Sequence, residues 1–154
     1  MTAYRHTQIG TLVLVPVGIS VILLVILIVG VAAHPIAVAV AVLLLVCITI
    51  FPSLTVEVTD NEVRVRFGLG PIGKRFPTSA IQQVRAVRNP WYYGWGIRWF
   101  PRGWLFNVSG LDAVELVMRD RRVYRIGTDQ PNELLAAIES VRSKESGVVS
   151  KGAS

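Results

Sequence analysis

Residues 12–31 read LVLVPVGISVILLVILIVGV, and residues 36–51 read IAVAVAVLLLVCITIF. Neither stretch contains Asp, Glu, Lys or Arg, and the charge-free run extends from Gln8 to Phe51. A helix rises about 1.5 Å per residue, so the first stretch would be about 30 Å long, the thickness of a bilayer's hydrocarbon core. The second gives about 24 Å, which spans a bilayer when flanking residues contribute. The sequence therefore predicts a transmembrane helical hairpin.

The predicted hairpin covers residues 11–52, with helices over about 11–32 and 35–52. Pro35 cannot continue a helix and favours an extended His34, which places a turn between the two helices. Many residues here are β-branched, but in lipid each segment has to satisfy its own backbone hydrogen bonds, which favours helices.

Three alternatives to a transmembrane hairpin remain. A cleaved signal peptide is disfavoured because the apolar stretch is long and a second one follows at once. A re-entrant loop is the second alternative. A buried hairpin of a soluble protein is disfavoured because the rest of the chain is too small to cover two helices that are apolar on all sides.

Charge is confined almost entirely to the region after the hairpin. All ten acidic residues lie at or after Glu57, and Arg5 is the one Lys or Arg of sixteen that precedes Pro52. The turn between the two apolar stretches has neither Lys nor Arg, so the positive-inside rule predicts a multi-pass protein with both termini in the cytoplasm. Residues 1–10 are then a cytoplasmic N-terminus. The single cysteine, Cys47, excludes an intramolecular disulfide.

The pattern changes at Leu54, where apolar and polar residues begin to alternate. Residues 54–59 and 62–67 both alternate and are separated by Asp60-Asn61, which predicts a β-hairpin with one buried face. Residues 68–73 form a predicted loop. Further strands are predicted over residues 74–77, 81–88, 104–109, 113–118 and 123–127.

A helical period replaces the strand period near the end of the chain. Thr128-Asp129 offers an N-cap, and Leu134, Ala137, Ile138 and Val141 fall on one helical face. The sequence predicts an amphipathic helix over residues 129–142 and a disordered tail over residues 143–154.

Several motifs resemble one family. The two spans, the hairpin TVEVTDNEVRVRFG (residues 55–68), the strand IQQVRAV (81–87), the motif YGWGIR (93–98) and the segment AVELVMRDRRVYRIGTDQPNELLAAI (113–138) together resemble bacterial membrane proteins with a pleckstrin-homology-like (PH-like) domain. The segment from Arg122 to Ile138 is the most specific part, and the resemblance extends to about Val141.

The resemblance implies a PH-like β domain over residues 53–142, a partly open barrel of about seven antiparallel strands that the C-terminal helix caps. It also implies the plasma (inner) membrane of a bacterium as the location. These families are mostly of unknown function, so the resemblance transfers no binding residues.

Residues 89–106 read NPWYYGWGIRWFPRGWLF and contain all four tryptophans. Aromatic rings with a polar tip favour the membrane–water interface, and arginine reaches phosphate headgroups. Two interpretations stay open: this segment contacts the membrane or a partner, or some of its rings pack inside the domain. The predicted contact residues are Trp91, Tyr92, Tyr93, Trp95, Arg98, Trp99, Arg102 and Trp104.

The remaining motifs predict no catalytic chemistry. The region after Pro52 has no His and no Cys, which removes the usual general base, thiol nucleophile and zinc ligands, and its carboxylates, Glu115 among them, are expected mostly at turns or on outward strand faces. Gly68, Gly70 and Gly73 satisfy G-x-G-x-x-G, but Pro71 interrupts it and no helix follows, so we expect a hairpin loop.

We expect a non-enzymatic module without metal or cofactor, in which the β domain docks on the inner leaflet or on another membrane protein. Membrane lipids, including anionic headgroups, are the expected partners, because basic residues beside an anionic leaflet each contribute about 1 kcal/mol. Nucleic-acid binding is not expected. The alternative function is a structural subunit of a larger membrane protein complex, and the sequence leaves the oligomeric state open.

Overall fold

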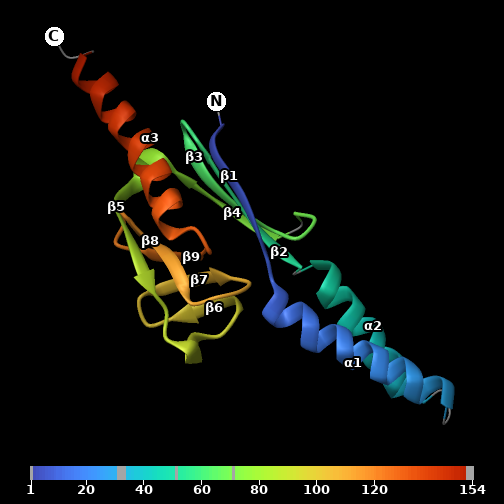
Figure 1. The fold of residues 1–154 in the computed structure, drawn as a ribbon. Helices are drawn as coiled ribbons and strands as arrows, with labels where there is room; N and C mark the ends of the chain where they lie inside the picture. Colours follow the sequence, from blue (N-terminus) through green and yellow to red (C-terminus); the bar gives the residue numbers. More distant parts are fainter. Residues whose placement is uncertain (1, 31–33, 51, 71, 152–154) are drawn as a thin grey trace.

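The computed structural model describes residues 2–30, 34–50, 52–70 and 72–151. It consists of a helical hairpin that projects from a β domain of two sheets, with a long C-terminal helix at the opposite end (Figure 1). The predicted division into an apolar helical part and a β part with a terminal helix is therefore present.

The hairpin consists of α1 (Thr11–Gly30) and α2 (Pro35–Ile50), which pack side by side (Figure 1). Among the described residues, α1 is the one helix long and apolar enough to cross a membrane, and α2, with 16 residues, is shorter. The predicted helix ends at 31–32 and 51 lie outside the described residues. Apolar side chains of α1 are open to the surroundings, with Ile26 62% and Val29 82% exposed, so this surface lacks a partner within the described chain.

The sequence did not predict β1 (Thr2–Ile9), which pairs antiparallel with β2 (Ser53–Thr59). Arg5 lies opposite Glu57, and the Arg5 Nε to Glu57 Oε1 distance is 3.3 Å. Two side chains of β1 also reach the residues just before the C-terminal helix. The Tyr4 hydroxyl donates to Gln130 Oε1 at 3.1 Å, and His6 Nε2 lies 2.6 Å from Asp129 Oδ1. The N-terminal segment is thus part of the β domain.

The first sheet has the order β1-β2-β3-β4, with β3 (Glu62–Phe67) and β4 (Ile72–Pro77). The predicted β2–β3 hairpin is confirmed: Val63, Val65 and Phe67 are fully buried, and the residues between them are half-exposed. A short 3-10 helix, η1 (Thr78–Ala80), leads from β4 to the second sheet.

The second sheet has the order β5-β8-β9-β7-β6. Its strands are β5 (Ile81–Arg88), β6 (Gly96–Phe100), β7 (Gly103–Asn107), β8 (Asp112–Met118) and β9 (Val123–Gly127). β7 runs parallel to β9, whereas the other pairs are antiparallel.

The observed strands differ from the predicted, partly open barrel of about seven antiparallel strands. The described residues form nine strands, not about seven, and one pair is parallel. The strands form two separate sheets that are not closed into a barrel. The two strands that the sequence did not predict, β1 and β6, each form an edge of a different sheet.

The core lies between the two sheets. Phe76 of the first sheet packs on Phe106 and Tyr124 of the second, with ring centroids 6.3 and 4.8 Å apart. The helix α3 (Pro131–Lys151) buries Leu134, Ile138 and Val141 in the same core, as predicted from their spacing. α3 begins two residues later than predicted and continues to Lys151, so the predicted disordered tail is wrong over residues 143–151; residues 152–154 lie outside the described chain.

Candidate functional site

The aromatic segment predicted as a contact site forms a 3-10 helix, η2 (Trp91–Tyr93), and the β6–β7 hairpin. Several of its rings point outward. Trp91 is 76%, Tyr92 67%, Trp99 70% and Trp104 45% exposed, and Trp99 and Trp104 lie opposite each other in the hairpin. Exposed apolar surfaces of this size are typical of sites that contact another protein or a membrane.

Other rings of the same segment pack within the domain. Tyr93 is half-buried, with its ring centroid 5.8 Å from that of Phe100. Trp95 is also half-buried, and its Nε1 donates to the Gly110 carbonyl at 3.3 Å. The interpretation that some rings pack inside the domain thus holds for Tyr93 and Trp95, and contact by the exposed rings stays a prediction.

The two arginines of the segment are exposed. The Nε atom of Arg98 donates to the Trp95 carbonyl at 3.1 Å, which leaves the rest of its guanidinium facing outward. Arg102 lies in the turn between β6 and β7. The outward-facing part of the site therefore combines cations with indole rings.

A buried ion cluster in the second sheet lies next to the aromatic segment. Glu115 of β8 is fully buried and lies between Arg85 of β5 and Arg125 of β9 in the sheet register. Arg125 Nε donates to Glu115 Oε2 and Arg85 Nε to Oε1, both at 2.7 Å. The sequence placed Glu115 among outward, solvated carboxylates, and that expectation is wrong, because the aromatic segment covers this face of the sheet.

Arg125 connects the cluster to the aromatic segment. Its guanidinium carbon lies 4.6 Å from the centroid of the Phe100 ring, and its Nη1 donates to Asn89 Oδ1 at 3.0 Å. Asn89 directly precedes Pro90 and η2. The cluster thus fixes both ends of the segment that carries Trp91 to Trp99. No sequence signal identifies it, since the three charged residues meet only through strand register.

The environment of Glu115 lowers the pKa of its carboxyl. Burial opposes ionisation, but hydrogen bonds from Arg125 and Arg85, together with their positive charges, outweigh that effect. The ionised carboxylate therefore contributes stability that is complete above the ordinary pKa of 4.5 and is lost as the pH falls through the lower folded-state value.

We expect the free energy of unfolding to fall with acidification below pH 4.5 more steeply in the wild type than in Glu115→Gln, which has no carboxyl to protonate there. Denaturant unfolding at a series of pH values measures this difference. The exposed Glu139→Gln serves as the control and should keep the wild-type slope. Parallel slopes for Glu115→Gln and wild type would contradict the assignment.

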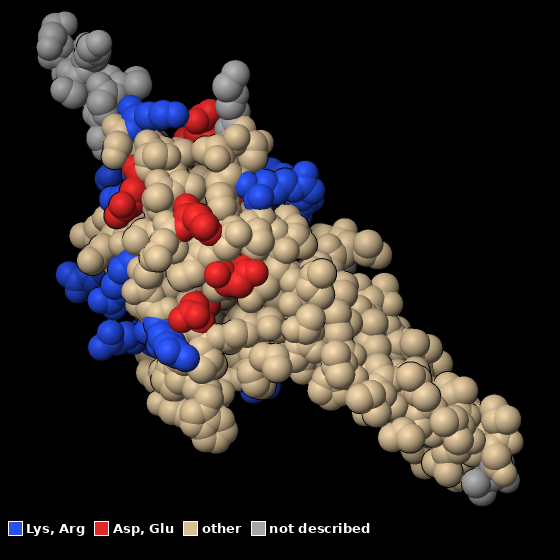
Figure 2. All heavy atoms as spheres, viewed as in Figure 1, with Lys and Arg blue, Asp and Glu red and all other residues tan. Residues whose placement is uncertain are grey.

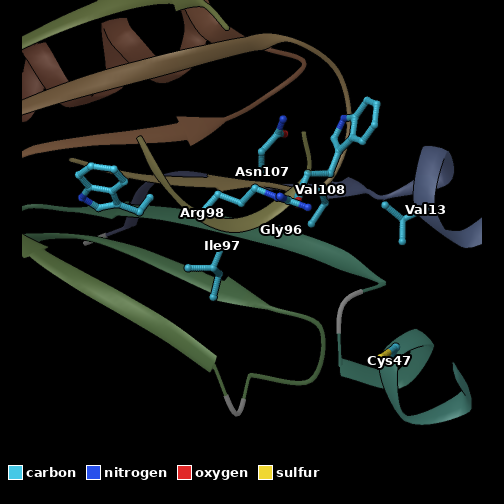
Figure 3. A pocket seen from close by; sticks show the side chains of 9 residues that line it. Val13, Cys47, Gly96, Ile97, Arg98, Asn107 and Val108 are labelled. Carbon is cyan, nitrogen blue, oxygen red and sulfur yellow. The ribbon is translucent and has the colours of Figure 1, made fainter. Parts of the chain in front are cut away.

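A pocket of about 630 Å³ separates the β6–β7 hairpin from the first turn of α1 and the end of α2 (Figure 3). Val13 and Cys47 line it from the two helices, and Ile97 and Arg98 line it from β6. Trp95, Gly96, Trp99, Asn107 and Val108 complete its wall. The aromatic segment is therefore adjacent to the root of the apolar hairpin.

A second pocket, of about 400 Å³, lies at the turn of the same β-hairpin. Its lining residues are Lys74, Trp99, Pro101, Arg102, Gly103, Trp104, Arg122, Val123 and Tyr124. Trp99 lines both pockets. Lys74 Nζ donates to the Tyr124 hydroxyl at 3.1 Å and lies 4.3 Å from the centre of its ring.

The remaining motif, G-x-G-x-x-G, lies at the connection between β3 and β4 and is followed by a strand, not by a helix. Gly68 and Gly70 adopt positive φ angles of 48° and 97° in the connection between β3 and β4. Strands flank this connection on both sides, as expected for a hairpin, but β4 already begins at Ile72, so the predicted loop over residues 68–73 extends two residues too far. The described residues contain no group of three His, Cys, Asp or Glu side chains arranged to hold a metal ion.

Comparison of the whole chain with known proteins adds no relative to this description. It matches no protein-family model, no curated protein and no solved structure. The resemblance to PH-like membrane proteins therefore stays a prediction from sequence, and any function has to be argued from the site itself.

Proposed function

We propose that this chain is a membrane-anchored, non-enzymatic module that docks on the inner leaflet of a bacterial plasma membrane, or on a membrane protein there, through the exposed rings of residues 91–104. In this proposal α1 and α2 both cross the bilayer, both termini are cytoplasmic, and the β domain is the PH-like domain. The observation that carries the proposal is that the exposed Trp99, together with Arg98, lines the pocket next to the beginning of α1 and the end of α2.

The surface chemistry supports an interfacial position for this segment. The projecting hairpin carries no charge in Figure 2, and Lys, Arg, Asp and Glu gather on the β domain. Indole rings favour the boundary between such regions, because one edge is apolar and the N–H is polar. Arg98 and Arg102 stand beside these rings and suit an anionic leaflet.

The pairing of β1 with β2 supports a two-pass arrangement. β1 leads into α1 and β2 follows α2, and the Gly10 amide donates to the Pro52 carbonyl at 2.9 Å. The beginning of α1 and the end of α2 are thereby held together at the β domain. A helix pair fixed in this way returns the chain to the side of the membrane from which it entered.

Quenching of intrinsic fluorescence by brominated lipids tests the docking directly, because all four tryptophans lie between residues 91 and 104. We expect strong quenching when the full chain is in nanodiscs whose lipids are brominated close to the headgroup. Quenching should increase when anionic lipid is added and should weaken at high salt, since exposed charges are screened.

Two variants distinguish direct lipid contact of the exposed rings from mere proximity of the β domain to the membrane. Trp91→Phe/Trp99→Phe removes the two most exposed indoles and should remove most of the quenching. Trp95→Phe, in which the replaced ring is half-buried, is the control and should leave most of it. Emission that brominated lipids leave unchanged would contradict membrane docking.

The alternative function, a structural subunit of a larger membrane complex, is favoured by the exposed apolar surface of α2. Leu43 is 61% and Leu45 51% exposed, although α2 already packs on α1. A complex formed through this surface would not use the aromatic segment. Alanine at Arg98, Trp99 and Arg102 would then leave lipid quenching and membrane extraction unchanged, whereas a charge introduced at Leu43 would disrupt assembly.

A further inference from the structure

The pocket at the β6–β7 turn has cations on three sides and no carboxylate in its wall. Lys74 comes from β4, Arg102 from the β6–β7 turn and Arg122 from the β8–β9 turn. Three aromatic residues, Trp99, Trp104 and Tyr124, also line the pocket. Three segments distant in sequence thus bring positive charge to one concave site.

Lys74 is the central group of this arrangement. It is half-buried, and its ammonium is held by the Tyr124 hydroxyl at 3.1 Å and by the ring face at 4.3 Å. Within the described residues, no carboxylate forms an ion pair with it. A partly desolvated cation without a counter-charge favours an incoming anion.

The two arginines add a recognition geometry that lysine lacks. Both are exposed; Arg102 has no ion-pair partner within the described chain, and Arg122 Nε lies 3.4 Å from Asp120 Oδ2. An exposed pair of this kind is weak, so Arg122 can reorient toward a stronger partner. Guanidinium groups bind phosphate oxygens through two parallel hydrogen bonds, which makes phosphate the anion that this set fits.

The floor of the pocket is fixed by the backbone. Gly103 lies opposite Val123 in the parallel β7–β9 pair, where a β-carbon would stand 1.8 Å from the Val123 carbonyl oxygen. The strands approach closely because residue 103 has no side chain. The volume of about 400 Å³ holds a phosphate together with part of the molecule that carries it.

We propose that this pocket is a binding site for a phosphate group, in which Lys74 supplies a fixed point charge and Arg102 and Arg122 close on the oxygens. The phosphate comes from a lipid headgroup or from a free phosphorylated molecule. Only the lipid source rests on the proposed function, because a soluble phosphate needs no docking on the leaflet.

Calorimetry on the full chain in neutral detergent tests the site with inorganic phosphate as the probe. The second arm uses nanodiscs of neutral lipid with and without phosphatidate, whose headgroup is a phosphate monoester, and asks whether phosphatidate prevents binding of the inorganic ion. Trp99 and Trp104 line the pocket, so their fluorescence provides a second readout.

Lys74→Gln/Arg102→Gln removes two cations of the site, and Arg88→Gln/Arg119→Gln removes two exposed cations that do not line it. We expect the first variant to weaken binding at least about tenfold and the second less than about twofold, because charge-assisted hydrogen bonds act at short range whereas distant surface charges are screened. Thermal unfolding checks that both variants are folded.

The outcomes test the phosphate site independently of the proposed membrane docking. Saturable phosphate binding that is lost in Lys74→Gln/Arg102→Gln supports the site, and competition by phosphatidate identifies the lipid as its source. Phosphate binding without competition supports the site and assigns it to a soluble molecule, even if the lipid quenching described above fails. Absence of saturable binding to either probe, or an equal loss in both variants, overturns the proposal.

Discussion

Glu115→Ala is expected to lower the free energy of unfolding by about 3–5 kcal/mol, as is usual when one partner of a buried ion pair is removed. The side chain of Arg125 is only 13% exposed, so it would keep a charge without its counter-ion. The loss should also loosen the aromatic segment, because Arg125 packs on Phe100 and holds Asn89. Urea unfolding in mild detergent, followed by tryptophan fluorescence, measures both effects.

A double-mutant cycle distinguishes the lost ion pair from simple loss of packing. Glu115→Leu/Arg125→Leu replaces two charges by apolar groups and should be more stable than Glu115→Leu alone. The exposed Glu139→Ala is the matched control and should change the free energy of unfolding by less than about 0.5 kcal/mol. Additive effects of the two leucine substitutions would show that Glu115 and Arg125 do not interact.

Gly103→Ala is expected to lower the free energy of unfolding by about 3 kcal/mol, at the upper end of the range for overpacking. The added methyl group would stand 1.8 Å from the Val123 carbonyl oxygen and 2.7 Å from its carbon. These are backbone atoms of the neighbouring strand, so no side chain can move aside. The clash is relieved only if β7 and β9 separate, which would also open the pocket that Lys74, Arg102 and Arg122 line.

The matched control for this prediction is Gly18→Ala in α1, where a β-carbon meets nothing within 4 Å. That change should be neutral or stabilising, because alanine favours a helix over glycine. Amide hydrogen exchange of β7 and β9 reports the opening directly. Unchanged protection in Gly103→Ala would mean that the two strands are not paired as described.

Local sequence patterns predicted the elements whose signal is contained in neighbouring residues. The alternation of Val63, Val65 and Phe67 is enough to place β3, and the spacing of Leu134, Ile138 and Val141 is enough to place α3. The charge-free composition gave α1 and α2 within a few residues.

The missed strands depend on partners that are distant in the chain. β1 reads TAYRHTQI, which has no apolar alternation, and its partner β2 begins more than forty residues later. β6 reads GIRWF, which is too short to show an alternating pattern, and its partner in the hairpin is again rich in aromatic residues. The parallel β7–β9 pair sets the strand order of the second sheet, and no local pattern encodes such a crossover.

The candidate site was likewise predictable only in part from local sequence. Composition identified the aromatic segment, because indole and guanidinium groups concentrate there irrespective of the fold. It could not tell that Trp99 and Tyr93 face opposite environments, since that depends on η2 folding back over Arg125. The contribution of Lys74 to a pocket with Arg122 likewise appears only when β4 and β9 are placed in space.

The β1–β2 ladder is directly connected to the helical hairpin through β1 and α1, and this couples the first sheet to the helices. Only Gly10 separates β1 from α1; it is buried, and a β-carbon there would lie 3.2 Å from the Val108 carbonyl oxygen. Gly68 passes still closer to the end of α2, where a β-carbon would lie 2.4 Å from the Ile50 carbonyl oxygen. These close approaches leave little room for the backbone at Gly10 or Gly68 to change, so a tilt of the helices in a membrane would be passed on to the first sheet.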